Sequence, residues 1–218
     1  MPPRVARPIP TLIYRIVHVD NLAPFVRRGY LHAPADSPED GLPYYPIHDE
    51  SIRVRRGGRS IPCGPGGTVD EYVSFYLGPR SPMLYRIAKG TVRCEGGQRS
   101  VVYLVSSVEK LNELGLRFVF SDGHGLSAIT RWYEDPEALD RLDWEQIQSR
   151  FWFDTEEDPD RCRRKQAELL VHGAVPWPAL LGVAVLDEEM QAEVEARLRG
   201  EVETMPYVKV RPDWYYVG

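Results

Sequence analysis

The sequence predicts an α+β fold in which a mixed, mostly antiparallel sheet is flanked by peripheral helices. Short segments rich in β-branched and aromatic residues alternate with segments whose apolar residues recur at helical spacing. This alternation favours an α+β architecture. The chain has 218 residues, of which 43% are hydrophobic, and it shows no internal repeat and no interdomain linker. We therefore expect one domain over residues 1–218.

The first predicted elements are a strand over residues 11–17 and a short helix over residues 22–28. The strand segment is apolar and β-branched. Asp20 or Asn21 can cap the helix, and Gly29 can stop it, since glycine tolerates the left-handed conformation that ends many helices.

Residues 33–68 hold no long periodic segment and are rich in Pro, Gly, Asp, Ser and Arg. A loop of this length in a compact domain is usually functional or disordered. Residues 72–77 predict a strand that ends at a Gly-Pro break, and residues 82–88 predict a helix with Ser81 as its N-cap. The aromatic segment 72–85 fits either a buried strand, loop and core helix or the wall of a cleft for a flat ligand ring.

The second half of the chain continues the alternation. The acidic segment from residue 187 to residue 200 has the pattern of an amphipathic helix. Strands are predicted over 101–107, 117–122, 167–173 and 180–186 and at YVKV and WYYV near the C-terminus, and helices over 108–115, within 126–166 and over 187–200.

Charge and hydropathy limit the possible classes of protein. The net charge is −5, most of the excess acid lies after residue 130, and basic residues form local stripes. Such a protein does not coat DNA generally, but it could hold a phosphate-bearing ligand in a defined groove. No apolar run approaches the length of about 18 residues that a membrane span needs, and no apolar signal core follows the first residues. We expect a cytoplasmic protein with no membrane contact.

Several common site motifs are absent from the sequence. It has neither the GxGxxG nor the GxxxxGK[ST] phosphate-binding pattern. The segments HDE (48–50) and DGH (122–124) lack a second pair at ligand spacing, so no metal site is expected. Cys63, Cys94 and Cys162 are odd in number and far apart, which favours reduced structural thiols.

Four segments carry a family resemblance. They are YRIVHVDNL (14–22), RRGGRSIPCGPGGTVDEYVSFYLGPRSPMLY (55–85), FSDGHG (120–125) and RRKQAELLVHGAVPW (163–177). Together they resemble the DarT-type DNA ADP-ribosyltransferase toxins, which are relatives of the poly-ADP-ribose polymerases. The resemblance implies a compact ADP-ribosyltransferase fold, NAD⁺ as substrate and transfer of ADP-ribose to a base in single-stranded DNA. It also implies a macrodomain antitoxin that removes the modification.

Glu168 is the candidate catalytic residue. It is the only carboxylate in KQAELLVHGAVPW and stands at the start of an apolar strand, where a charge is costly without a purpose. Cleavage of the nicotinamide–ribose bond develops positive charge on the ribose, which a carboxylate stabilises. The same carboxylate could take the proton from the attacking base nitrogen. The alternative is a strand-edge glutamate that faces water.

Cofactor-binding residues follow from the same resemblance. His18 closes the first strand where relatives hold the NAD⁺ ribose and the nicotinamide edge, and Asn21 lies at the following helix start. Phe75 and Tyr76 end the strand that carries the nicotinamide-stacking aromatic residue in the polymerases. Since neighbours in a strand face opposite sides, only one can stack, and the motif favours Phe75. Ser81 matches the serine that opens the next helix.

An arginine from the loop before this strand enters the NAD⁺ site in DarT-type enzymes. Arg59 and Arg56 are the candidates, with Arg59 assigned to catalysis and Arg56 to NAD⁺ binding. A guanidinium there would pair bidentately with phosphate or carboxylate. A solvated basic loop is the alternative for either residue.

The family places DNA over the segment before the catalytic glutamate. That segment interleaves aromatic residues with arginines, a pattern that suits base stacking and phosphate contacts. Trp144 fits a helix core better, and nearby acidic residues argue against tight non-specific binding. His124 could orient the target base or cap a turn. The predicted nucleic-acid contacts are His124, Arg150, Trp152 and Arg163.

The predicted activity is NAD⁺-dependent mono-ADP-ribosylation of ssDNA, with thymine favoured over the guanine that some relatives modify. Two alternatives stay open at this point. The first is an ADP-ribosyltransferase for protein or RNA, which the same cleft would serve. The second is a nucleotide- or DNA-binding module without turnover, which would release no nicotinamide.

Overall fold

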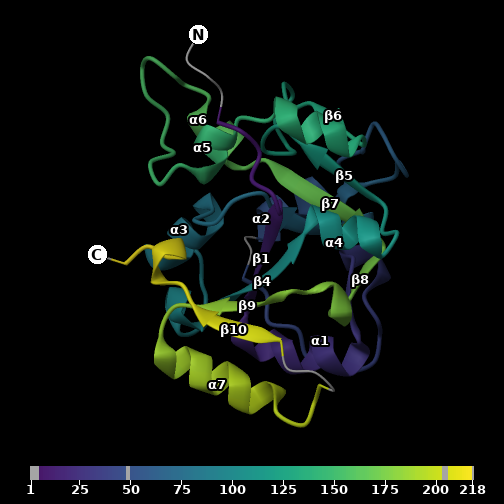
Figure 1. The fold of residues 1–218 in the computed structure, drawn as a ribbon, viewed down its shortest axis with the longest axis vertical. Helices are drawn as coiled ribbons and strands as arrows, with labels where there is room; N and C mark the ends of the chain where they lie inside the picture. The colour runs from purple at the N-terminus through teal and green to yellow at the C-terminus, as the bar shows by residue number, and fades with distance from the viewer. Residues whose placement is uncertain (1–4, 48–49, 203–205, 218) are drawn as a thin grey trace.

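A computed structural model of the chain describes residues 5–47, 50–202 and 206–217. Within them, an eight-stranded sheet of order β10-β9-β4-β1-β3-β7-β5-β6 crosses the molecule, and β2 and β8 form a second, two-stranded sheet (Figure 1). All pairs are antiparallel except β10 with β9. The strands are β1 (Leu12–His18), β2 (Tyr30–His32), β3 (Tyr72–Tyr76), β4 (Val101–Ser107), β5 (Phe118–Ser121), β6 (Trp132–Tyr133), β7 (Glu168–His172), β8 (Ala174–Pro176), β9 (Gly182–Val185) and β10 (Tyr207–Val210).

Helices lie around the sheet, with α1 and α7 at one end of the molecule and α5 and α6 at the other (Figure 1). Two sequence signals for helix ends are confirmed. Gly29 ends α1 with a φ of 72°, and the Ser81 hydroxyl accepts the Leu84 amide at 3.2 Å as the N-cap of α3. None of the described helices is long and apolar enough to span a bilayer. The helices are α1 (Leu22–Arg28), α2 (Glu50–Gly57), α3 (Pro82–Ala88), α4 (Val108–Glu113), α5 (Trp144–Gln148), α6 (Arg161–Lys165) and α7 (Glu188–Leu198).

The large sheet consists of two halves that meet at one residue pair. β1 pairs with β4 along all of its residues, from Leu12 to His18, but with β3 only at Tyr14 and Tyr76. Beyond that pair, β1 and β3 diverge, and the Arg15 guanidinium donates across the gap to the Ser74 carbonyl at 2.9 Å. We call the Tyr14–Tyr76 pair and the gap beside it the seam.

Apolar residues pack on both sides of the sheet. Phe75 and Leu169 belong to the larger core cluster, and Tyr14 and Tyr103 belong to a second cluster on the other side. The C-terminal segment WYYV was expected to be a strand, and that prediction is wrong. Pro212–Trp214 is a 3₁₀ turn that inserts Trp214 beneath β1 and β4, and the Tyr103 hydroxyl donates to the Trp214 carbonyl at 2.9 Å.

Two other segments differ from the sequence prediction. Residues 126–166 were expected to be helical and mixed, and they hold a short strand, a 3₁₀ turn and two five-residue helices, so the helical spacing of apolar residues does not form one continuous helix. Asp143 interrupts the pattern, because its carboxylate caps α5 by accepting the Gln146 amide at 3.0 Å. The segment 33–68 contains α2, an eight-residue helix that the polar sequence did not reveal.

The turn after β3 is held by residues that are distant in sequence. Arg80 has a φ of 58°, and its carbonyl accepts the Tyr216 hydroxyl at 2.6 Å. Its amide donates to the Tyr103 hydroxyl at 3.2 Å. The C-terminal segment therefore fixes the turn that connects the seam to α3.

Gly78 should be irreplaceable in this turn. A Cβ atom there would lie 2.4 Å from the Ile147 carbonyl oxygen. This oxygen belongs to the backbone, so it can move only if the main chain shifts. We expect Gly78→Ala to lower the free energy of unfolding by about 1–3 kcal/mol. Gly58→Ala is the control, because nothing lies within 4 Å of its Cβ position, and it should stay within about 0.5 kcal/mol of wild type. Urea unfolding measures the stability of both variants. Equal stability would contradict the close packing of Gly78 against Ile147.

Candidate active site

A cavity of about 580 Å³ opens at the seam, where β1 and β3 diverge. Its wall combines apolar and aromatic side chains with a few charged ones, which is the usual make-up of a ligand site. Charged and polar wall residues come from several elements, among them β1, α2, β3, the 122–130 loop and the segment that leads into β7. They include Arg15, Arg56, Ser74, His124, Gln166 and Glu168.

The central feature of the cavity is an ion pair between Arg56 and Glu168. Arg56 Nη2 lies 2.5 Å from Glu168 Oε2, and Nη1 lies 3.1 Å from Oε1. The Gly125 amide donates to Oε1 at 3.0 Å. The Glu168 side chain is only 5% exposed, so its charge would be costly without these three donors. The Arg56 guanidinium also reaches the Ser74 hydroxyl at 3.4 Å.

The ion pair changes the ionisation of its neighbours. Burial lowers the pKa of Arg56, but the charge of Glu168 and its hydrogen bonds raise that pKa by more than burial lowers it. The net shift is upward, so the guanidinium stays charged. Burial raises the pKa of Tyr76, and Glu168 acts in the same direction while Arg56 opposes it, so the phenol stays neutral.

His124 stands beside the pair as a neutral imidazole. Burial lowers the pKa of His124, Glu168 raises it and Arg56 lowers it, with a net shift downward. Its Nδ1 accepts the Leu126 amide at 3.2 Å, which leaves the proton on Nε2. His124 can therefore offer an N–H donor at the cavity wall.

The structure brings Arg56, not Arg59, to Glu168. Arg59 is not among the described residues that line the cavity. Its backbone instead fixes the loop that follows α2: its amide donates to the Arg56 carbonyl and its carbonyl accepts the Val69 amide, both at 2.9 Å. The structure thus places Arg56, and not Arg59, next to the Glu168 carboxylate.

Phe75 was expected to face the nicotinamide, but it is Tyr76 that lies on the same face of the sheet as Glu168. Tyr76 is directly opposite Glu168 in the β3–β7 register, so the two side chains share a face of the sheet. Phe75 faces the other side, is 1% exposed and packs in the core with Leu169, although it still contributes to the cavity wall. Tyr76 is thus the aromatic residue next to the ion pair.

His18 and Asn21 contact a wall segment of the cavity and are not themselves among its described lining residues. The Asn21 amide donates to the Tyr45 carbonyl and accepts the Tyr45 amide, both at 2.8 Å. The His18 ring stacks on the Tyr45 ring with centroids 5.6 Å apart. Tyr44 and Pro46, on either side, line the cavity. Ser81 is buried at the start of α3, next to the wall residue Pro82.

The predicted nucleic-acid residues lie in different environments. Arg150 is exposed, as a phosphate contact requires. Trp152 is 5% exposed, because it packs edge-on against Tyr85 and its indole N–H donates to the Tyr216 hydroxyl at 2.7 Å. A side chain buried in this way offers little surface for base stacking. The Arg163 guanidinium is bound to aspartates within the protein, so it is not a free phosphate ligand.

Several wall or contact residues were not found from the sequence, among them Arg15, Ser74, Gly125 and Gln166. Arg15 carried one signal, since it is a charge inside an apolar strand segment. Gly125 carried another, as the last residue of the Gly-His-Gly motif. A Cβ on Gly125 would lie 2.6 Å from Glu168 Oε1, so no other residue fits there without displacing the carboxylate.

Comparisons with known proteins identify the family of the chain. Residues 14–216 match the family model described as "ssDNA thymidine ADP-ribosyltransferase, DarT". The DNA ADP-ribosyl transferase of Thermus sp. (strain 2.9) is 41% identical over 210 residues, which cover 96% of this chain and 98% of that protein. The DNA ADP-ribosyl transferase of Escherichia coli O127:H6 is 33% identical over 96% of this chain and 95% of its own length.

Solved structures agree in fold as well. Thermus sp. 2.9 DarT in complex with ADP-ribosylated ssDNA superposes with a TM-score of 0.91 at 40% identity, covering 98% of this chain and 100% of that one. The same protein in complex with NAD⁺ gives a TM-score of 0.85 at 40% identity, covering 96% and 99%. The predicted ADP-ribosyltransferase fold is therefore confirmed, and the chain belongs to DarT, the family of ssDNA thymidine ADP-ribosyltransferases.

Proposed function

We propose that this chain, as a single catalytic domain, cleaves NAD⁺ in the seam cavity and transfers ADP-ribose to a thymidine base of ssDNA. Membership of the family makes it an NAD⁺-dependent DNA ADP-ribosyltransferase. The observation that carries the assignment of residues is the buried Arg56–Glu168 pair inside that cavity.

The cavity residues suit NAD⁺ as the substrate. Flat rings need apolar and aromatic walls, which Phe25, Tyr44 and Tyr72 supply. The diphosphate needs donors, and Arg15 Nε is buried without a hydrogen-bond partner among the described residues. The Thermus sp. 2.9 relative has been solved with NAD⁺, which supports the same use of the cavity here.

Glu168 would supply the electrostatic part of catalysis. As the bond between the ribose carbon and nicotinamide breaks, positive charge develops on the ribose, and a carboxylate fixed beside it stabilises that charge. Arg56 and the Gly125 amide hold the carboxylate in one orientation. The new bond forms between the same ribose carbon and the base. The proton lost by the base is taken up by the Glu168 carboxylate.

Residues on the DNA side would select and hold the base. His124 lines the cavity as a neutral donor, which suits a carbonyl oxygen of thymine. Arg150 is exposed and would contact a backbone phosphate. The Thermus sp. 2.9 complex with ADP-ribosylated ssDNA supports ssDNA as the partner of this chain.

The chain would act in the cytoplasm as the toxin of a toxin–antitoxin pair, with a macrodomain antitoxin that reverses the modification. A relative from Thermosipho africanus is a fusion of a DNA ADP-ribosyl transferase and a DNA ADP-ribosyl glycohydrolase. That fusion joins transfer and removal in one protein, which supports a separate glycohydrolase partner for this chain.

Incubation with NAD⁺ and short single-stranded oligonucleotides, followed by mass measurement, tests the function. We expect a mass gain of one ADP-ribose on oligonucleotides that contain thymidine, with release of nicotinamide. Adducts on RNA or protein alone would support a different acceptor. If neither an adduct nor released nicotinamide is detected, the protein would be a nucleotide- or DNA-binding module without turnover.

Replacement of Glu168 by glutamine tests its electrostatic role. Glu168→Gln keeps the shape but removes the charge, so we expect kcat to fall by about 100- to 1,000-fold. Glu193→Gln is a matched control, since Glu193 is an ion-pairing glutamate on the surface of α7. A Glu168→Gln protein that modifies DNA at the wild-type rate would refute the mechanism.

Lysine substitutions separate the two candidate arginines. A lysine at position 56 can contact only one carboxylate oxygen at a time, whereas the guanidinium holds both. We expect Arg56→Lys to lower kcat/KM for NAD⁺ by about 100-fold and Arg59→Lys to change it little. Steady-state kinetics with a fixed oligonucleotide measures both, and the reverse order would assign the role to Arg59.

A further inference from the structure

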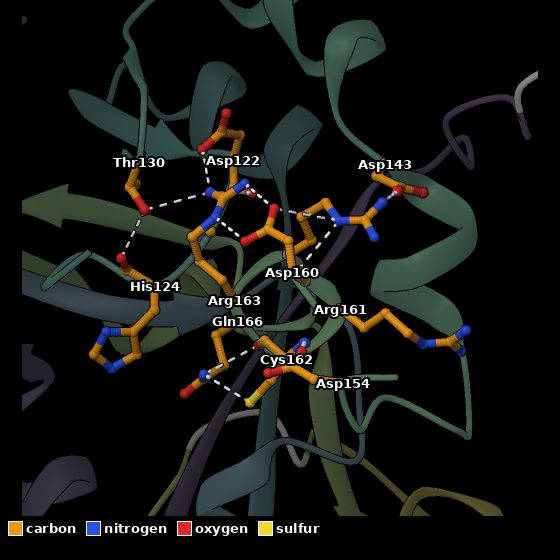
Figure 2. A network of polar contacts seen from close by, with 12 residues as sticks. Asp122, His124, Thr130, Asp143, Asp154, Asp160, Arg161, Cys162, Arg163 and Gln166 are labelled. Carbon is orange, nitrogen blue, oxygen red and sulfur yellow. Dashed lines mark hydrogen bonds and ion pairs between the residues drawn. The ribbon is translucent and has the colours of Figure 1, made fainter. Parts of the chain in front are cut away.

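One side chain connects the two segments that flank the catalytic carboxylate. The Arg163 guanidinium lies between the loop of residues 122–130 and α6, the helix that precedes Glu168 (Figure 2). Its side chain is 15% exposed, so it is largely withdrawn from solvent. Gly123 packs against it so closely that a Cβ there would lie 2.3 Å from Arg163 Nη1.

All three guanidinium nitrogens of Arg163 have partners. Nε and Nη2 each donate at 2.7 Å to one oxygen of Asp160, which anchors the side chain to its own helix. Nη1 donates at 2.8 Å to Asp122 Oδ1, with longer contacts to the Asp122 carbonyl and the Thr130 hydroxyl. One arginine therefore holds both ends of the 122–130 loop.

The backbone of Arg163 holds the middle of the same loop. Its carbonyl accepts the His124 amide at 3.0 Å, and the next amide, that of Gly125, donates to Glu168 Oε1 at 3.0 Å. The Thr130 hydroxyl closes the loop by donating to the His124 carbonyl at 2.8 Å. A shift of the loop would therefore move a hydrogen-bond donor of the catalytic carboxylate and the His124 side chain together.

We propose that Arg163 is a positioning residue that clamps the 122–130 loop so that the Gly125 amide and His124 face the Glu168 carboxylate. This inference rests on the role proposed above for Glu168. It replaces a direct phosphate contact by Arg163 with an indirect effect on the reacting centre.

Arg164 provides a matched control on the same helix. Its guanidinium also binds aspartates, Asp143 and Asp158, and is similarly withdrawn from solvent. Among the described residues, its guanidinium partners Asp143, Asp158 and Asp160 all lie outside the 122–130 loop. Loss of either arginine thus removes ion pairs from α6, but only loss of Arg163 releases the loop.

The experiment compares Arg163→Ala with Arg164→Ala in steady-state kinetics and in hydrogen exchange. We expect Arg163→Ala to lower kcat about 10- to 100-fold, since small displacements of catalytic groups have large effects on rate, with little change in KM for NAD⁺ or for the oligonucleotide. Amides of residues 122–130 should exchange faster. Arg164→Ala should keep kcat and the exchange of that loop near wild type.

Three results would overturn the clamp. The first is equal loss of kcat in both alanine variants, which would mean that only α6 stability matters. The second is a loss of kcat in Arg163→Ala with unchanged exchange in residues 122–130. The third is a raised KM for the oligonucleotide at unchanged kcat, which would indicate a direct DNA contact.

Two further variants keep the test decisive if Arg163→Ala does not fold. Asp122→Asn weakens the clamp from the loop side and should lower kcat in the same direction, while Arg163→Lys keeps the charge and should recover part of the loss. Different results would refute the proposed function: a wild-type protein that forms no adduct, or a Glu168→Gln variant with full activity. In that case the exchange of residues 122–130 still tests the clamp.

Discussion

The structure depends on one charged contact, between Arg56 and Glu168, at the seam of two half-sheets. Removal of two charges from water is expensive, and a buried pair is tolerated only when its remaining hydrogen-bonding capacity is filled. Here the carboxylate oxygens accept two guanidinium nitrogens and the Gly125 amide. Because both oxygens already have donors, a ribose hydroxyl in the cavity must share this carboxylate with Arg56. The pair thus sets the resting geometry of the carboxylate and, in the proposed mechanism, the place where positive charge is stabilised.

The seam explains why the cavity lies where it does. A continuous sheet would leave no space between β1 and β3, but these strands pair only at Tyr14 and Tyr76. β1 is paired with β4 along its whole length, and β3 is paired with β7. The gap between β1 and β3 therefore leaves the hydrogen bonds of both half-sheets intact. The turn after β3 must then be fixed from outside the sheet. Arg80 and the Tyr216 hydroxyl perform this task, which makes the C-terminal segment part of the support of the site.

Local signals in the sequence were sufficient for most of the elements, but not for α2 or the C-terminal turn, and they did not decide which face of a strand meets the site. Ser81 and Gly29 mark helix ends through chemistry that acts within a few residues, and both predictions hold. Helix α2 has no such signal: it is rich in charge, its Val54 is 62% exposed, and the contact of Arg56 with Glu168 links it to a strand 112 positions away. Alternation correctly separated Phe75 from Tyr76, but only the register with β7 decides which of them meets Glu168. The burial of Trp152 likewise depends on aromatic partners that are distant in sequence.

The basic cluster at residues 161–165 shows how composition can mislead about nucleic-acid binding. The surrounding segment has little regular secondary structure. Side chains must therefore make many of the contacts that backbone hydrogen bonds make in a helix or a sheet. Arg163 and Arg164 do this by binding aspartates, and Nζ of Lys165, whose pKa burial lowers to about 7, donates to the Ile147 carbonyl at 2.7 Å. Arginines that are already paired with carboxylates do not neutralise DNA phosphates, so they displace no counterions from the DNA. The release of those counterions is what gives non-specific binding its strength. Recognition would therefore rest on the base that enters the cavity beside Glu168, which suits an enzyme that acts on a chosen base and does not coat the strand.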